Sequence, residues 1–152
     1  MIELATLDRH FDGMPPVAAM HIRAMAFDGN GLVLHAPLSA NVNDKQCAFG
    51  GSLASVMTLA GWGWLMLAAD RAGLTSEVYV ADSKIGYLAP LYEDLHARAW
   101  LRPGQDWAAI IRTLGERKRA SATMQAEVRN SAGMVAATLE ARFALKRVEA
   151  TP

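Results

Sequence analysis

The sequence predicts an α+β fold in which a long apolar central helix is wrapped by a mainly antiparallel β-sheet. Residues 48–69 carry no charged side chain. Residues 120–128 and 135–145 alternate apolar and polar side chains, the pattern of strands with one buried face. A sheet that curves around the apolar helix is the simplest way to hide that helix from water.

Length and composition limit the class of protein. The chain has 152 residues, of which 52% are hydrophobic, so we expect a single domain over residues 1–152 with one core. The 15 Lys and Arg balance the 15 Asp and Glu, which leaves no overall field to attract nucleic acid or an acidic membrane surface. Cys47 is the only cysteine, and the N-terminus lacks the basic-then-apolar pattern of a secretory signal. We therefore expect a cytoplasmic protein.

The first part of the chain predicts a short helix and a hairpin. Residues 2–11 have the spacing of an amphipathic helix that ends near Gly13 and the proline pair that follows. Residues 22–27 and 32–36 read as two antiparallel strands. They flank the run Asp28-Gly29-Asn30-Gly31, whose residues tolerate positive φ and favour a tight turn. A polar loop over residues 39–46 then leads to the long helix.

The long helix would also fit a bilayer by its length. Four glycines interrupt it, and the strands that follow need a core to pack on. We therefore expect no membrane span, but a core helix that ends near Gly73, a plausible helix C-cap.

The second half predicts four strands and one inserted helix. Residues 78–88 and 95–101 form the first two strands, and residues 105–114 have helical spacing. Residues 120–128 and 135–145 form a hairpin that turns at residues 130–133, because the apolar positions switch from even to odd numbers across that turn.

Chemistry is concentrated where the polar loop meets the long helix. Gly50 and Gly51 leave backbone N–H groups bare at the first helical turn, where no intrahelical acceptor exists. With the helix dipole, these N–H groups can polarise a thioester carbonyl. The alternative is that the two glycines only permit close packing against strands.

The same segment resembles the hotdog thioesterases, in which an Asn stands seven residues before the first Gly of a His-Gly-Gly at the central helix. Asn43 and Gly50 have this separation. The chain resembles the YiiD C-terminal family of thioesterases more closely, from about Pro15 to Lys146. The motifs that carry this resemblance are Asn43-Asp44-Lys45, Phe49-Gly50-Gly51-Ser52-Leu53, Thr58-Leu59-Ala60-Gly61-Trp62 and Ile85-Gly86-Tyr87-Leu88-Ala89-Pro90.

The resemblance implies a hotdog fold and hydrolysis of an acyl thioester, either acyl-CoA or acyl-acyl carrier protein, without a cofactor. It also implies a homodimer or a dimer of dimers, with sites between protomers. Two departures remove the usual base. The His before the two glycines is Phe49, and the position of the common catalytic Asp or Glu, eight residues after the first glycine, is Thr58.

Three residues are candidates to guide water in place of that base. Asp82 lies in a strand with apolar neighbours, so its charge needs a partner or a pocket, and it is the preferred base. Its alternative role is an ion pair with Lys84. Asp44, just before the helix, is either a base or a loop cap. Thr58 could hold a water, or bond a helix carbonyl as an ordinary core threonine.

Further residues are expected to line the site. Phe49, Ser52, Ser83 and Cys47 are candidate substrate-binding residues, and Cys47 is alternatively a nucleophile beside a helix N-terminus. We expect no metal, because the four histidines lack the spacing of a metal site. Two other functions stay open: a non-catalytic acyl-CoA-binding protein, which the missing carboxylate favours, and a hydratase or dehydratase of the same fold.

Overall fold

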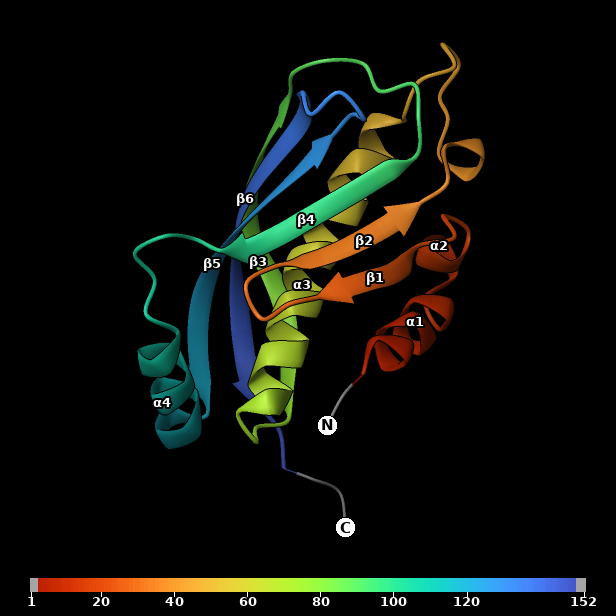
Figure 1. Cartoon of the computed structure of the whole chain (residues 1–152). Helices are drawn as coiled ribbons and strands as arrows, with labels where there is room; N and C mark the ends of the chain where they lie inside the picture. Colours follow the sequence, from red (N-terminus) through yellow and green to blue (C-terminus); the bar gives the residue numbers. More distant parts are fainter. Residues whose placement is uncertain (1–2, 150–152) are drawn as a thin grey trace.

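The computed structural model describes residues 3–149. The helices are α1 (Leu4–Asp12), α2 (Pro15–Ala18), α3 (Gly50–Arg71) and α4 (Trp107–Arg117), with a 3-10 turn η1 (Leu38–Ala40). The strands are β1 (Arg23–Phe27), β2 (Leu32–Ala36), β3 (Ser76–Tyr87), β4 (Leu95–Leu101), β5 (Arg119–Arg129) and β6 (Val135–Arg147). The expected α+β architecture, a long helix wrapped by an antiparallel sheet, is confirmed (Figure 1).

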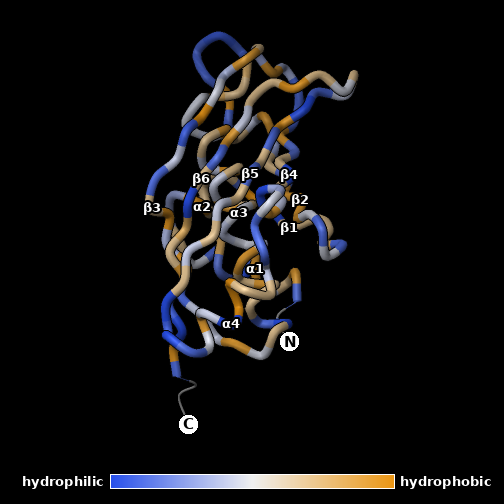
Figure 2. The backbone as a smooth tube through the Cα atoms, turned by 90° about the vertical axis from the view of Figure 1, so that its left-hand side faces the viewer, coloured by the Kyte–Doolittle hydropathy of each residue, from blue (hydrophilic) through white to orange (hydrophobic). Residues whose placement is uncertain are grey.

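The sheet has six strands in the order β1-β2-β4-β5-β6-β3, and every neighbouring pair is antiparallel. Even-numbered residues of β5 from Ala122 to Val128 are buried, as the alternation predicts, and they face α3. Seen from the side, the strands lie around α3 (Figure 2). The two edges of the sheet are β1 and β3.

Helix α3 is the centre of the core. By length and composition α3 is able to cross a membrane, but 67% of its most apolar window is buried within the fold, as in the core helix of a globular domain. Gly63 permits this packing, because a Cβ there would lie only 2.7 Å from a Leu32 methyl carbon. The helix ends at Arg71 with Ala72 as its C-cap, close to Gly73 as expected. Gly73 follows the cap with a φ of +80°, and its N–H donates to the Asp70 carbonyl.

Strand β3 differs from the other long strands in its exposure. Residues 79–84 are exposed on both faces of the strand. A bulge between Val80 and Asp82 shifts the register against β6, so odd-numbered residues point to the outer face before it and even-numbered residues after it. The face of β3 toward α3 is buried near the start of the strand, exposed in the middle and partly buried again at Ile85.

Two local expectations need correction. The proline pair after Gly13 does not simply end a helix, because Pro15 and Pro16 begin the one-turn helix α2, whose first turn tolerates proline. The inserted helix α4 starts at Trp107 instead of residue 105, because the Asp106 side chain caps it by accepting the Ala109 N–H. Ile2, expected in the first helix, lies outside the described residues.

Candidate functional site

The first turn of α3 presents free backbone donors. Phe49 is the N-cap residue, and its carbonyl accepts the N–H groups of Ser52 and Leu53 at 3.0 Å. Within residues 3–149, neither the Gly50 N–H nor the Gly51 N–H donates a hydrogen bond. The N-terminal end of the helix dipole adds partial positive charge at this point. These two groups are thus available to a ligand oxygen.

A cavity of about 300 Å³ opens beside Gly50, the first of these two residues. Its lining residues are mostly apolar and come from the loop before α3, the first turns of α3, the end of β3 and the segment that follows it: Cys47, Ala48, Gly50, Leu53, Tyr87, Leu88, Ala89, Pro90 and Leu91. We call it the α3 cavity. An apolar cavity with a few convergent donors is the usual form of a small-molecule site.

Tyr87 closes one side of the α3 cavity, and its role was not anticipated from the sequence. Its ring lies 3.5 Å from the position that a Cβ of Gly50 would occupy. Its hydroxyl donates to the Gly50 carbonyl at 3.2 Å. The signal was present, because Tyr87 belongs to one of the motifs that carry the family resemblance.

Asn43 organises the loop instead of pointing into the α3 cavity. Its side-chain oxygen accepts the N–H groups of Lys45 and Cys47, and its amide lies 3.2 Å from the Cys47 sulfur. Cys47 is buried and lines the α3 cavity. These bonds favour a role for Asn43 in positioning the loop over a direct contact with a thioester.

Asn41 is a second residue that sequence reasoning missed. It is 3% exposed, and its amide donates to the carbonyls of Met20 and Pro37. The backbone carbonyl of Asn41 accepts the Phe49 N–H at 2.7 Å, so Asn41 holds the N-cap residue of α3 in place. The sequence does not indicate this role, because the Met20 and Pro37 carbonyls come close to Asn41 only in the folded chain.

Phe49 takes the place of the consensus histidine. Its side chain is half exposed, and its ring covers Gly51 so closely that a Cβ there would lie 2.5 Å from a ring carbon. The ring has no group that accepts a proton, but it offers an apolar surface beside the free donors. Ser52 is buried in the first turn, and Ser83 is exposed in the middle of β3.

The candidate bases do not reach the α3 cavity within one chain. Asp44 has a side chain 84% exposed and lies 3.1 Å from the Lys45 ammonium. The Asp82 side chain is 67% exposed on the outer face of the sheet and pairs with Arg142 at 2.8 Å. The expected alternative partner, Lys84, is therefore corrected to Arg142, because β6 places that guanidinium opposite Asp82.

Thr58 is partly buried and bonds a carbonyl of its own helix, α3. Its hydroxyl donates to the Ala54 carbonyl at 2.8 Å, a bond within the helix. In the part of the chain that the structure describes, no group of three His, Cys, Asp or Glu residues could hold a metal ion.

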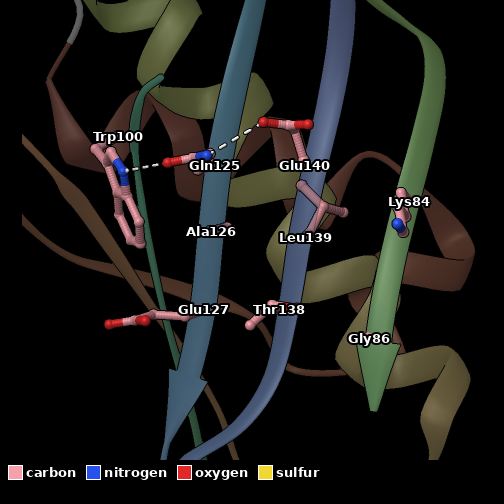
Figure 3. Close-up of a pocket in the computed structure, with 9 residues that line it drawn as sticks. All are labelled: Lys84, Gly86, Trp100, Gln125, Ala126, Glu127, Thr138, Leu139 and Glu140. Carbon is pink, nitrogen blue, oxygen red and sulfur yellow. Dashed lines mark hydrogen bonds between the residues drawn. The ribbon is translucent and has the colours of Figure 1, made fainter. Parts of the chain in front are cut away.

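A second hollow, of about 410 Å³, lies on the outer face of the sheet (Figure 3). Three of its side chains already bond one another: Trp100 donates to Gln125 at 3.1 Å, and Gln125 donates to Glu140 at 3.2 Å. A ligand there would have to break these bonds, whereas the donors at α3 are free. The α3 cavity is therefore the better candidate site.

Known proteins resemble this chain in sequence and in structure. The model of the family described as "Putative thioesterase (yiiD_Cterm)" matches residues 5–147. A protein of unknown function from Chlorobaculum tepidum has a similar structure, with 25% identity, a TM-score of 0.88 and coverage of 95% of this chain and 94% of the other.

Two further solved structures share the hotdog fold with this chain. A protein described as a putative thioesterase from Shewanella oneidensis has 24% identity, a TM-score of 0.83 and coverage of 93% of this chain and 95% of the other. A thioesterase from Haemophilus influenzae has 14% identity, a TM-score of 0.76 and coverage of 97% and 92%.

Proposed function

Because the chain belongs to the YiiD C-terminal family of putative thioesterases, we propose that it hydrolyses an acyl thioester, carried by coenzyme A or by acyl carrier protein. The observation that carries this proposal is the free N–H group of Gly50 at an apolar cavity, with the free N–H group of Gly51 beside it in the same helical turn. The cavity holds the acyl side of the substrate, and the donors face its carbonyl.

The two N–H donors are expected to accelerate hydrolysis, because negative charge develops on the carbonyl oxygen when water attacks. Two N–H groups at a helix N-terminus stabilise that oxyanion more than they stabilise the neutral thioester. Phe49 and Leu53 keep the surroundings apolar, which strengthens these bonds. No cofactor is required, since the thiolate is itself a good leaving group.

The same protein is proposed to act as a homodimer through β3. This strand is 12 residues long and lies at the sheet edge, where exposed strands usually pair or carry protection. It exposes Tyr79, Val80 and Tyr87, and Val80 is 49% exposed although it lies on the face toward α3. Pairing of two copies along β3 covers this apolar surface.

Glu77 and Lys84 suit an antiparallel pairing of β3 with itself. They lie equally far along the chain from the point between Val80 and Ala81, at the bulge, and the bulge leaves both on the outer face. In an isologous pair, Glu77 of each copy then meets Lys84 of the other. A dimer of dimers would need an additional surface.

A binding protein without turnover is the second candidate function. It is favoured by one observation: the lining of the α3 cavity contains no histidine or carboxylate. A hydratase or dehydratase needs such a pair and is disfavoured for the same reason. A cytoplasmic location fits either function, since Cys47 is free.

The test is hydrolysis of short, medium and long acyl-CoAs and of one acyl-acyl carrier protein, followed with a thiol reagent. We expect turnover with one optimum of chain length. Asp44→Asn and Asp82→Asn report whether either exposed carboxylate is the base, and we expect both to retain activity. If acyl-CoA raises the melting temperature but no thiol is released from any substrate, the protein is a binder.

A further inference from the structure

A second apolar cavity lies at the opposite end of β3. It has a volume of about 460 Å³ between α1, the second half of α3 and the start of β3. The residues that line it are His10, Trp62, Met66, Thr75, Ser76, Glu77, Val78 and Tyr79. We call it the β3 cavity.

Contacts between side chains and backbone hold the walls of the β3 cavity, and the walls include one basic side chain, His10, without a hydrogen-bond partner in the described part of the chain. The Trp62 indole N–H donates to the Val78 carbonyl at 3.0 Å. The His10 ring stands edge-on to Trp62, with 5.7 Å between the ring centroids. His10 is exposed at the cavity, and within residues 3–149 no hydrogen-bond or ion-pair partner of its ring lies in reach.

Two other polar groups border the β3 cavity. Ser76 is 8% exposed, and its hydroxyl has no hydrogen-bond partner among the described residues, although such a buried group normally has one. Glu77 points to the outer face of the sheet, where its carboxylate accepts the Tyr79 hydroxyl at 2.8 Å. His10 is therefore the proton acceptor best placed to serve a ligand in this cavity.

Strand β3 joins the two cavities, with Ser76 in one and Tyr87 in the other. Ser76, before the bulge, and Tyr87, after it, both face α3. If β3 pairs antiparallel with a second copy of itself, the start of one strand lies beside the end of the other. The β3 cavity of each subunit then meets the α3 cavity of its partner.

We propose that each active site is composite, and that His10 of the partner subunit is the general base for the donors of Gly50 and Gly51. This inference rests on the thioesterase function and on the β3 dimer proposed above. It supplies the base that the α3 cavity lacks. The Trp62 and Met66 side chains that come with it extend the apolar wall along the acyl chain.

The proton transfers balance as follows. The His10 imidazole takes a proton from water while the water oxygen bonds to the thioester carbon. The resulting oxyanion is held by the Gly50 and Gly51 N–H groups. When the C–S bond breaks, the imidazolium returns its proton to the leaving thiolate, and the carboxylic acid product releases its proton to solvent.

Complementation between two inactive variants tests this arrangement. His10→Ala removes the base, and Gly50→Pro removes one donor. We expect each variant to lose about 10²-fold or more in kcat. After the two variants are mixed and their subunits exchanged, half of the dimers are mixed and each holds one intact site, so about a quarter of the wild-type activity returns. His96→Ala, at an exposed histidine on the outer face of the sheet, is the matched control and retains activity.

Three results would overturn the composite site. If light scattering shows that the protein is a monomer, no partner subunit is present to supply His10. Full activity of His10→Ala would show that His10 is not the base, and it would leave the proposed thioesterase function unaffected. No recovery in the mixture, when both variants are folded and exchange is confirmed by differently tagged subunits, means that His10 and Gly50 act within one chain. Failure of the wild-type protein to hydrolyse any acyl thioester instead overturns the proposed function itself.

Discussion

Replacing Gly50 by proline removes one proposed oxyanion donor and leaves α3 in place. Gly50 is the first residue of the helix, where proline is well tolerated because its missing N–H has no intrahelical acceptor. Phe49 before it has φ −64° and ψ 131°, an extended conformation that a following proline allows. A Cβ at position 50 makes only ordinary contact with Tyr87 at 3.5 Å.

The expected loss follows from the energy of one donor. Removal of a single oxyanion donor typically costs about 2.7–4 kcal/mol in the transition state, or about 10²- to 10³-fold in kcat. Gly50→Ala keeps the N–H and is the matched control, with kcat near wild type. Steady-state thiol release at saturating acyl-CoA gives both values, and thermal unfolding checks the fold. A Gly50→Pro variant with unchanged kcat would show that this N–H does not stabilise the oxyanion.

The remaining predictions concern stability. Gly63→Ala should lower the free energy of unfolding by about 1–3 kcal/mol, since its Cβ would lie 2.7 Å from a fully buried leucine side chain. Gly115→Ala is also in a helix, but its Cβ would lie in open space, so it should raise the free energy of unfolding by about 0.5–1 kcal/mol. Urea denaturation compares the two variants, and equal effects on the free energy of unfolding would contradict the packing argument. The Leu38 N–H first, and then the His35 imidazole, hold the pKa of Asp94 below its usual range. Because the folded pKa is depressed, the stabilisation by Asp94 is present above its unfolded pKa of about 3.9 and is lost as the pH falls through the lower folded value. Asp94→Asn should therefore be less stable than wild type at pH 6 and converge with it in acid; a constant difference across that range would contradict this assignment.

Periodicity predicted the fold well, because hydrophobic burial determines it. The apolar run before Gly73 and the alternation in residues 120–128 and 135–145 each point to one element with one buried surface, and each was confirmed. The bulge at Val80 could not be predicted, since it depends on how β3 registers against β6. That shift decides which face Asp82 occupies, and so its ion pair with Arg142.

The candidate site was only partly predictable for a similar reason. Gly50 and Gly51 could be identified from the sequence, because bare N–H groups at a helix start are a local property of the chain. Tyr87 and Asn41 act through contacts between distant segments, and these contacts exist only after the chain folds. His10 is more distant still, since its proposed role requires a second copy of the chain.

Hydrolysis in water enriched in oxygen-18 tests the central claim most directly. The wild-type protein is given a single equivalent of the best acyl-CoA substrate, and both products are measured by mass spectrometry. The account predicts one thiol and one carboxylate per substrate, with a single oxygen-18 atom in the carboxylate from the attacking water. Intact acyl-CoA recovered from the complex, with no labelled carboxylate, would contradict it and show that the chain binds thioesters without hydrolysing them.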